Sequence, residues 1–322
     1  MRIASTLVVS LAALFSALSV SATAYPVKPI TLIIGFAPGG PSDVMSRILT
    51  KKMEEHLKQP FIIENRPGAA GGLAGGLVAR AAPDGYTVLL GTGTILAINV
   101  SMYRNLGYDP VKDFEPISLI GTQTNVLYTH PSLPAKTLAE FIAHTKANPG
   151  KISFGSGGIG TPAHLAGELL KLKAGIQITH VPFRGTGPTL QNVIGNHVPA
   201  AFNPPSPLIP HLQAGTIRAI AITTPTRTAA LPDVPTIAES GFPGFDAATW
   251  HALVAPAKTP KDVIAALHRA LEFAVKDPAT RKALTDLGID VVGGKPDQLR
   301  YYIRSEIPKW AEVVKASGAT VN

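Results

Sequence analysis

A chain of 322 residues with 45% hydrophobic residues can form one large or two medium-sized domains with a substantial core, which excludes a disordered protein. The sequence has no cysteine, so disulfides, thiolate metal sites and a thiol nucleophile are excluded. The net charge of +8 comes from lysines and arginines interleaved with acids, a pattern typical of solvated surfaces that gives no indication of nucleic-acid binding.

The first 24 residues, "MRIASTLVVSLAALFSALSVSATA", have the pattern of a cleavable signal peptide. Arg2 supplies the positive end, an apolar run follows, and Ala22-Thr23-Ala24 is a small-residue cleavage site. A core helix or a membrane anchor is the alternative, but the run is short and interrupted by serines. With no cysteine to carry a lipid, the pattern predicts an exported protein that begins at Tyr25 and is free in the periplasm.

Strand-like and helical patterns alternate along the first half of the mature chain, as in parallel α/β units. The predicted strands cover residues 30–36, 61–66, 86–92, 114–122 and 125–130, and the predicted helices cover 43–57, 71–82 and 138–147.

The same alternation restarts in the second half. Strands are predicted at 151–156, 178–183, 198–203 and 217–223, with helices at 163–174 and 188–196. A proline-rich connection, 225–244, follows. Beyond it the pattern predicts a strand at 250–256, helices at 260–276 and 278–288, a short strand at 290–294 and a last helix at 298–317.

A near repeat joins the two halves: "ITLIIGFAPGGPSDVMSRIL" and "KISFGSGGIGTPAHLAGELL" both combine a strand, a glycine-rich turn, a proline and a helix. Pro41 and Pro162 fit the first helical position, which makes Gly40 and Thr161 the N-caps. We expect the amides of the next two residues, Ser42 and Asp43 in one repeat and Ala163 and His164 in the other, to lack intrahelical acceptors.

Such helix starts attract anions, because free amides and the helix dipole stabilise a carboxylate or phosphate without a charged side chain. Ordinary βα turns are the alternative. Two turns of this kind at the carboxyl ends of strands in two similar halves are what a cleft between lobes requires.

The enzyme motifs are weak. "GSGGIG", residues 155–160, has the spacing of a dinucleotide fingerprint, but the next strand ends without an acid for a ribose hydroxyl. Patterns of P-loops, serine hydrolases and zinc peptidases do not occur, and the histidines have no metal-ligand spacing. We therefore predict no catalytic residue, no metal and no cofactor.

Three side chains have open interpretations. His164, in the first turn of the second repeat helix, either donates to a ligand or is a partly exposed helix residue. Trp250 either walls a pocket or fills the core near the hinge. Arg184 is the strong cation nearest these turns and either contacts the ligand or is solvated.

The two repeat stretches resemble the sequences of one protein family. So do "ENRPGAAGGLAGGLVARAAPDGYTVLLGT", "VPFRGTGPTLQNVIGNHV" and "LPDVPTIAESGFPGF", and the resemblance covers essentially the whole chain. The sequence is similar to the Bug or TctC-type periplasmic receptors, the solute-binding components of tripartite tricarboxylate transporters. The resemblance implies an α/β fold of the two-lobed, type II-like periplasmic binding proteins, with the ligand cleft between two α/β domains joined by a hinge. Domain 1 is expected at 25–122 and 247–322, and domain 2 at 123–246, after the signal peptide 1–24.

The resemblance also implies which residues bind the ligand. The expected set combines the two repeat turns with Thr92 and three further positions of the second domain: Phe36, Ala37, Gly40, Ser42, Asp43, Thr92, Ser156, Gly157, Thr161, Ala163, His164, Arg184, Gly185 and Asn203. Related receptors often have Tyr-Lys-Gly and Phe-Asp where this chain has Phe183-Arg184-Gly185 and Phe202-Asn203. The loss of that acid disfavours an amino-acid ligand.

The predicted function is capture of a small organic carboxylate, a di- or tricarboxylate or an aromatic acid, by a monomeric receptor that presents it to membrane transporter subunits. Ligand binding would shift the balance between open and closed lobes. An exported hydrolase or lyase acting on a carboxylated substrate is the main alternative. A scaffold that binds only protein is the third and would require an exposed apolar patch.

Overall fold

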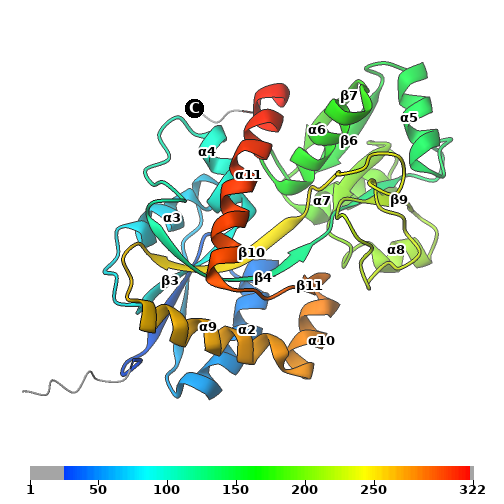
Figure 1. Ribbon diagram of the computed structural model, residues 1–322. Coiled ribbons are helices and arrows are strands. Elements are labelled where there is room, and N and C mark those ends of the chain that lie inside the picture. The colour runs from blue at the N-terminus through cyan, green and yellow to red at the C-terminus, as the bar shows by residue number, and fades with distance from the viewer. Residues whose placement is uncertain (1–24, 320–322) are drawn as a thin grey trace, which may run out of the picture.

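The computed structural model describes residues 25–319, so the predicted signal peptide 1–24 lies outside the described residues. The strands form two separate sheets (Figure 1). The larger has the order β11-β4-β10-β3-β1-β2. Its strands are β1 (Ile30–Ile34), β2 (Phe61–Asn65), β3 (Thr87–Thr92), β4 (Phe114–Gln123), β10 (Thr249–Pro256) and β11 (Ile289–Val291).

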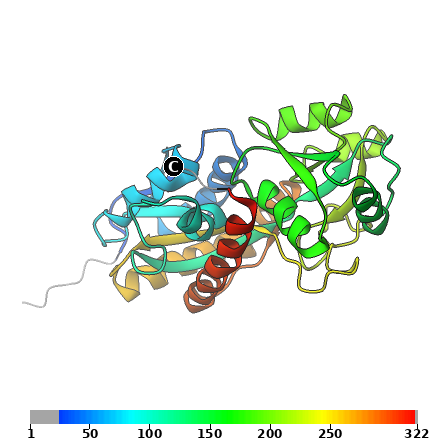
Figure 2. The same cartoon turned by 90° about the horizontal axis from the view of Figure 1, so that it is seen from above.

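The smaller sheet has the order β7-β6-β8-β5-β9. Its strands are β5 (Val126–Thr129), β6 (Ile152–Ser156), β7 (Ile178–Pro182), β8 (Ala200–Asn203) and β9 (Arg218–Ile222). We call the six-stranded sheet with its helices the first lobe and the five-stranded sheet with its helices the second lobe. Figures 1 and 2 show the two lobes side by side, which confirms the predicted two-lobed α/β fold.

Helices cover the sheets of both lobes. The first lobe carries α2 (Pro41–Leu57), η1 (Ala69–Gly71), α3 (Gly72–Ala79), η2 (Thr94–Ile98), α4 (Asn99–Met102), α9 (Lys261–Lys276), α10 (Pro278–Asp286) and α11 (Pro296–Ser317). The second carries α5 (Leu138–Ala147), α6 (Pro162–Ala174), α7 (Thr186–Ile194) and α8 (Ile209–Gln213). None of the helices within residues 25–319 is long and apolar enough to cross a membrane.

The repeat predicted from sequence is present as two sets of three parallel strands. β1 pairs in parallel with β2 and β3, and β6 pairs in parallel with β7 and β8. In each sheet the carboxyl ends of these strands therefore meet at one edge. The chain leaves that edge through the glycine-rich turns and enters α2 and α6, so the two turns belong to corresponding positions of the two lobes.

Two segments connect the lobes. β4 passes into β5 through Thr124 and Asn125, and the proline-rich connection after β9 returns to β10. The Asn125 amide donates to Thr223 Oγ1 at 2.9 Å, and the Thr223 amide donates to Thr124 Oγ1 at 3.1 Å. β10 pairs antiparallel with β3 and β4, which places the returning strand in the middle of the first sheet.

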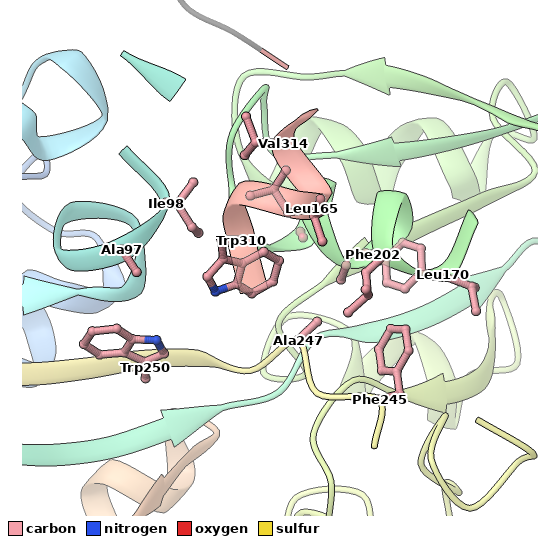
Figure 3. Close-up of a cluster of buried hydrophobic side chains, with 14 of the residues drawn as sticks. Ala97, Ile98, Leu165, Leu170, Phe202, Phe245, Ala247, Trp250, Trp310 and Val314 are labelled. Atoms are coloured by element: carbon pink, nitrogen blue, oxygen red, sulfur yellow. The ribbon is translucent and has the colours of Figure 1, made fainter. Parts of the chain in front are cut away.

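The largest hydrophobic core cluster contains residues of both lobes. Figure 3 shows Ala97, Ile98 and Trp250 of the first lobe in one cluster with Leu165 and Phe202 of the second. Helix α11 contacts α4 and η2 on one side and α6 on the other, and Figure 2 shows it at the junction of the lobes. Of the two interpretations of Trp250, the core position near the hinge is correct.

A buried carboxylate organises this junction. Glu306 of α11 is 3% exposed, and its Oε2 accepts hydrogen bonds from the indole nitrogens of Trp250 and Trp310, both at 2.9 Å. Lys309 forms an ion pair with the same carboxylate. The two tryptophans, 0% and 1% exposed, are thereby fixed against each other through one side chain.

We expect Glu306→Leu to lower the free energy of unfolding by about 2–3 kcal/mol, because two buried indole N–H groups lose their acceptor. Urea denaturation checks this value. Glu306→Gln, which keeps one acceptor oxygen, serves as the control and should cost clearly less. Equal losses in the two variants would contradict a role for the indole hydrogen bonds.

Four short elements were not predicted: η1, η2, α4 and α8. They are brief, and η2 continues directly from β3 as a single π-helical turn. The remaining predicted helices and strands are confirmed, and the proline-rich stretch 225–244 contains no helix or strand. The proposed domain boundaries stay a prediction.

Candidate functional site

A cavity of about 590 Å³ lies between the lobes and is lined by residues of both. The first lobe contributes Phe36, Gly40, Pro41, Ser42, Ala70, Thr92, Thr94, Tyr103, Gln123, Thr249 and His251. Asn125 lines it from the connection between β4 and β5. The second lobe contributes Gly157, Gly158, Ile159, Gly160, Thr161, Pro162, Ala163, Gly185, Thr186, Asn203 and Pro204.

The first predicted anion site lies on the wall of this cavity. Pro41 begins α2 and Gly40 is its N-cap, as the sequence predicted. In the described part of the chain the Ser42 amide has no hydrogen-bond acceptor. It lies in the first helical turn, where the positive end of the helix dipole adds to its attraction for an anion.

The second predicted anion site faces the same cavity from the other lobe. Pro162 begins α6, and the Thr161 hydroxyl caps the helix by accepting from the His164 amide at 3.3 Å. The Ala163 amide has no acceptor among residues 25–319. One free amide from each lobe therefore meets the cavity at a helix start.

Two of the four amides expected to be free are not. The Asp43 amide donates to the Gly40 carbonyl at 3.0 Å, and the His164 amide donates to the Thr161 hydroxyl. The prediction was wrong for these two because the N-cap residue folds back and satisfies the third amide of the helix. Each anion site thus offers fewer amides than expected.

The Asp43 side chain serves the first turn rather than the cavity. Its carboxylate accepts from the Gly39 amide at 3.0 Å and from Arg47 at 3.0 and 3.1 Å. The hydrogen bond from Arg47 holds the pKa of Asp43 below its ordinary value. Asp43 therefore fixes the turn that carries the Gly40 cap, and it does not line the cavity.

His164 lies behind the second turn. Its ring stacks on His180, with centroids 3.8 Å apart, and its Nδ1 accepts from the Gly160 amide at 3.1 Å. His180 Nε2 lies 2.7 Å from Ser156 Oγ, which is also hydrogen-bonded to Gly158. The partly exposed position proposed for His164 is wrong, because the residue is buried. It does not line the cavity but supports the loop that walls it, and its role as a ligand donor stays a prediction.

Burial lowers the pKa values of these two imidazoles. Burial, followed by the charges of His180 and Lys171, brings the pKa of His164 to about 3, and burial and Lys171 bring that of His180 to about 4. Both rings are therefore neutral at pH 7. A neutral His164 is required, because only an unprotonated Nδ1 accepts from the Gly160 amide.

The cavity wall contains no Asp, Glu, Lys or Arg among the described residues. Its one histidine, His251, is 4% exposed, and burial lowers its pKa to about 4. Neither ring nitrogen of His251 has a partner within the part of the chain that the structure describes. An anion in this cavity would be held by neutral donors and helix dipoles rather than by an ion pair.

The floor of the cavity is formed by the strands that join the lobes. Asn125 Nδ2 donates to Thr249 Oγ1 at 3.3 Å, and Thr249 pairs with Gln123 across β10 and β4. Two residues further along β10, His251 pairs with Thr92 of β3. A row of uncharged polar side chains thus crosses from one lobe to the other.

The structure brings most of the predicted ligand-binding residues together. The cavity wall includes Phe36, Gly40, Ser42, Thr92, Gly157, Thr161, Ala163, Gly185 and Asn203. The other predicted residues do not line it: Ala37, Asp43, Ser156, His164 and Arg184. Ala37 and Arg184 are exposed, whereas the other three are buried.

The sequence interpretation missed the floor residues other than Thr92, and the first-lobe residues Ala70 and Tyr103. Ala70 belongs to a run of left-handed residues, with φ of 48° at Ala69 and 50° at Ala70. Left-handed alanines are strained and are often found at functional sites. No sequence pattern indicates this conformation, although the surrounding glycines of "RPGAAGG" mark a tight turn.

The family was identified by comparison with known proteins. A model of the tripartite tricarboxylate transporter family receptor, TctC, matches residues 45–319. The chain belongs to the TctC family. The Bordetella pertussis protein BugT is 38% identical over 301 residues, which cover 93% of this chain and 92% of BugT. The resemblance stated from sequence is confirmed.

Solved structures of TctC-like receptors share the fold. The R. palustris protein Rpa4515, solved with adipate, is 34% identical with a TM-score of 0.80 and covers 92% of this chain and 100% of its own. MatC from Rhodopseudomonas palustris, solved with malate, is 34% identical with a TM-score of 0.75 and covers 90% of this chain and 100% of its own. Both neighbours were therefore solved with small dicarboxylates.

Proposed function

We propose that this TctC-family protein is a periplasmic receptor that binds a small organic carboxylate between its lobes. The observation that carries the proposal is the convergence of two helix starts, each with a free amide, on one charge-free cavity. The carboxylate would receive one hydrogen bond from Ser42 N–H in the first lobe and one from Ala163 N–H in the second. Adipate and malate in the related structures support this ligand class.

Binding would favour the closed lobes because half of the donors belong to each lobe. A ligand that occupies only the first site loses the donors of the second, so its affinity is higher for the closed state. That difference in affinity is what shifts the population, and the closed form would be presented to membrane transporter subunits. The hinge hydrogen bonds around Asn125 and Thr223 lie where such a motion would turn.

The proposal includes export, with a signal peptide ending at Ala24, a mature start at Tyr25 and no lipid anchor. It also includes action as a monomer. N-terminal sequencing of periplasmic extract tests the mature start, and light scattering tests the oligomeric state. Recovery of the protein mainly with membranes would contradict this localisation.

A thermal-shift screen of aliphatic and aromatic mono-, di- and tricarboxylates tests the function itself. An acid present at 100 times its dissociation constant should stabilise the folded protein by about 2.7 kcal/mol. Nuclear magnetic resonance of the best ligand after overnight incubation should show the ligand unchanged. Turnover would favour the hydrolase or lyase alternative, and the absence of stabilisation by every acid would contradict the proposal.

Binding through the backbone predicts different effects of two changes at one position. Ser42→Ala removes only the hydroxyl and should change the dissociation constant less than about threefold. Ser42→Pro also removes the amide hydrogen, while the first helical turn tolerates proline, so binding should weaken by about tenfold or more. Isothermal titration calorimetry on both variants measures this. Equal losses would show that the hydroxyl, and not the amide, holds the ligand.

A further inference from the structure

The end of the cavity nearest α7 has a distinct set of hydrogen-bonding groups. Asn203, the last residue of β8, is 1% exposed and lines the cavity. Its Nδ2 donates to Tyr128 Oη at 2.8 Å and to the Thr186 carbonyl at 3.3 Å. Its Oδ1 has no partner within residues 25–319.

The contact with Thr186 fixes which way the Asn203 amide points. Two carbonyl oxygens cannot bond each other, so the atom beside the Thr186 carbonyl is the nitrogen. Both hydrogens of Nδ2 are then in use. Asn203 therefore has one unsatisfied polar atom at the cavity wall, the buried acceptor Oδ1, and an unsatisfied buried acceptor is costly.

A free donor belongs to the residue whose carbonyl Asn203 contacts. Thr186 is the first residue of α7, and its amide has no acceptor in the described part of the chain. Gly185, the N-cap, has φ of 105°, a conformation that side chains rarely adopt, and no atom lies within 4 Å of where its Cβ would be. Gly185, Thr186 and Asn203, which all line the cavity, form what we call the α7 subsite.

The chemistry of the α7 subsite selects among ligand groups. A carboxylate only accepts hydrogen bonds, so Oδ1 would repel it. An ammonium group only donates hydrogen bonds, so it offers no acceptor to the Thr186 N–H. A methylene group leaves both unpaired. A hydroxyl is the smallest neutral group that accepts from the N–H and donates to the oxygen.

We infer that the α7 subsite binds a hydroxyl group, so that the ligand is a hydroxy carboxylic acid. This inference rests on the proposed function, because the ligand's carboxylate is assigned to the amides of Ser42 and Ala163. It adds a specificity determinant: the carboxylate gives binding, and Asn203 with Thr186 distinguishes a hydroxyl from hydrogen or ammonium at the same carbon.

The test compares acids of one skeleton by calorimetry at pH 7.5. The four-carbon set consists of the two enantiomers of malate (hydroxy acid), succinate (deoxy analogue) and L-aspartate (amino acid), which differ at one carbon only. The six-carbon set repeats the comparison with 2-hydroxyadipate, adipate and 2-aminoadipate. In the set that fits the cavity, one hydroxy acid should bind about ten- to a hundredfold more tightly than its deoxy analogue, and the amino acid should bind most weakly.

Two variants test the residue. In Asn203→Leu the affinities for the hydroxy acid and its deoxy analogue should become equal, because the acceptor is lost. Asn203→Asp places a carboxylate beside the ligand, so the protein should bind the hydroxy acid and its deoxy analogue more weakly. Its affinity for the amino acid should rise relative to its affinity for these two. Only affinity ratios are compared, so general destabilisation of a variant does not affect the result. Tyr301→Ser, which changes a 76% exposed side chain of α11 outside the cavity wall, serves as the control and should keep the wild-type ratio.

The outcomes separate the two proposals. Binding of hydroxy and deoxy acids with equal affinity by the wild-type protein would overturn the α7 subsite while leaving the proposed function intact. A ratio that is unchanged in Asn203→Leu would also overturn it. Failure of every carboxylate to bind would instead contradict the proposed function.

Discussion

Replacing Gly160 by valine is expected to weaken carboxylate binding by about a hundredfold or more while the protein remains folded. Gly160 has φ of 75°, and a Cβ at this position would lie 2.4 Å from Met102 Cε and 2.6 Å from Met102 Sδ. Met102 belongs to α4 of the first lobe, whereas Gly160 belongs to the second. A side chain here would therefore have to displace the end of the Met102 side chain, which packs between the lobes at the cavity wall.

The same substitution disturbs the loop itself. A β-branched residue is strained at positive φ, and the Gly160 amide is the donor to His164 Nδ1 at 3.1 Å. A shift of this segment would displace Thr161 and the helix start behind it, which supply the second-lobe donors. Because the closed state is destabilised and its donors are misplaced, calorimetry should show little binding.

Gly175 provides the matched control. It caps the other end of the same helix, α6, with φ of 61°, and nothing lies within 4 Å of its Cβ position. Gly175→Val should cost about 1–2 kcal/mol of stability through backbone strain, with the dissociation constant unchanged.

A second control separates the contact between the lobes from the strain. Shortening the facing side chain in Gly160→Val/Met102→Ala should restore part of the lost affinity. If Gly160→Val binds as tightly as wild type, the contact between the lobes is not part of closure.

The local parts of the site follow from sequence because helix starts have local signals. Proline at the first helical position and a glycine or threonine before it predicted α2 and α6 together with their caps. Placement of the turns at one edge of each sheet then follows from parallel pairing. These features can be predicted because each is determined by a few residues that are neighbours in the sequence.

The rest of the site depends on contacts between distant segments. Thr249 and Asn125 are 124 residues apart in the sequence and meet because β10 pairs with β4, and no local pattern records that register. His164 was misplaced for a similar reason. Its position in the first turn of α6 was predicted, but its direction was set by His180, which lies on a different strand and stacks on it. Side-chain direction at a helix start is decided by the packing partner.

Acidification from pH 7 to pH 4.5 is expected to lower the free energy of unfolding by several kcal/mol, through His164, His180 and His251. Burial is the first cause of each shift, and it brings their pKa values to about 3, about 4 and about 4. In the unfolded chain a histidine has a pKa of about 6.5, so below that pH the unfolded state binds more protons than the folded state.

The sign follows from linkage. A histidine with a depressed pKa in the folded state contributes stability that is fully present above pH 6.5 and is lost as the pH falls towards the folded pKa. Each unit of depression corresponds to about 1.4 kcal/mol. The carboxylates with lowered pKa values, such as Asp43 and Asp277, act mainly below about pH 4, so the window from pH 7 to 4.5 reports on the histidines.

Urea denaturation at half-unit pH intervals measures the effect, because the slope of the unfolding free energy against pH gives the difference in bound protons. His251→Leu should reduce that slope by up to one proton, since His251 titrates without a hydrogen-bond partner in the described residues. His164→Asn keeps an acceptor near the Gly160 amide but removes a titrating group, so it should flatten the profile while preserving carboxylate affinity at pH 7.5. A wild-type stability that is the same at pH 7 and pH 4.5 would mean that these rings take up protons without unfolding, and the loop Ser156–Thr161 would then have to open locally to admit them.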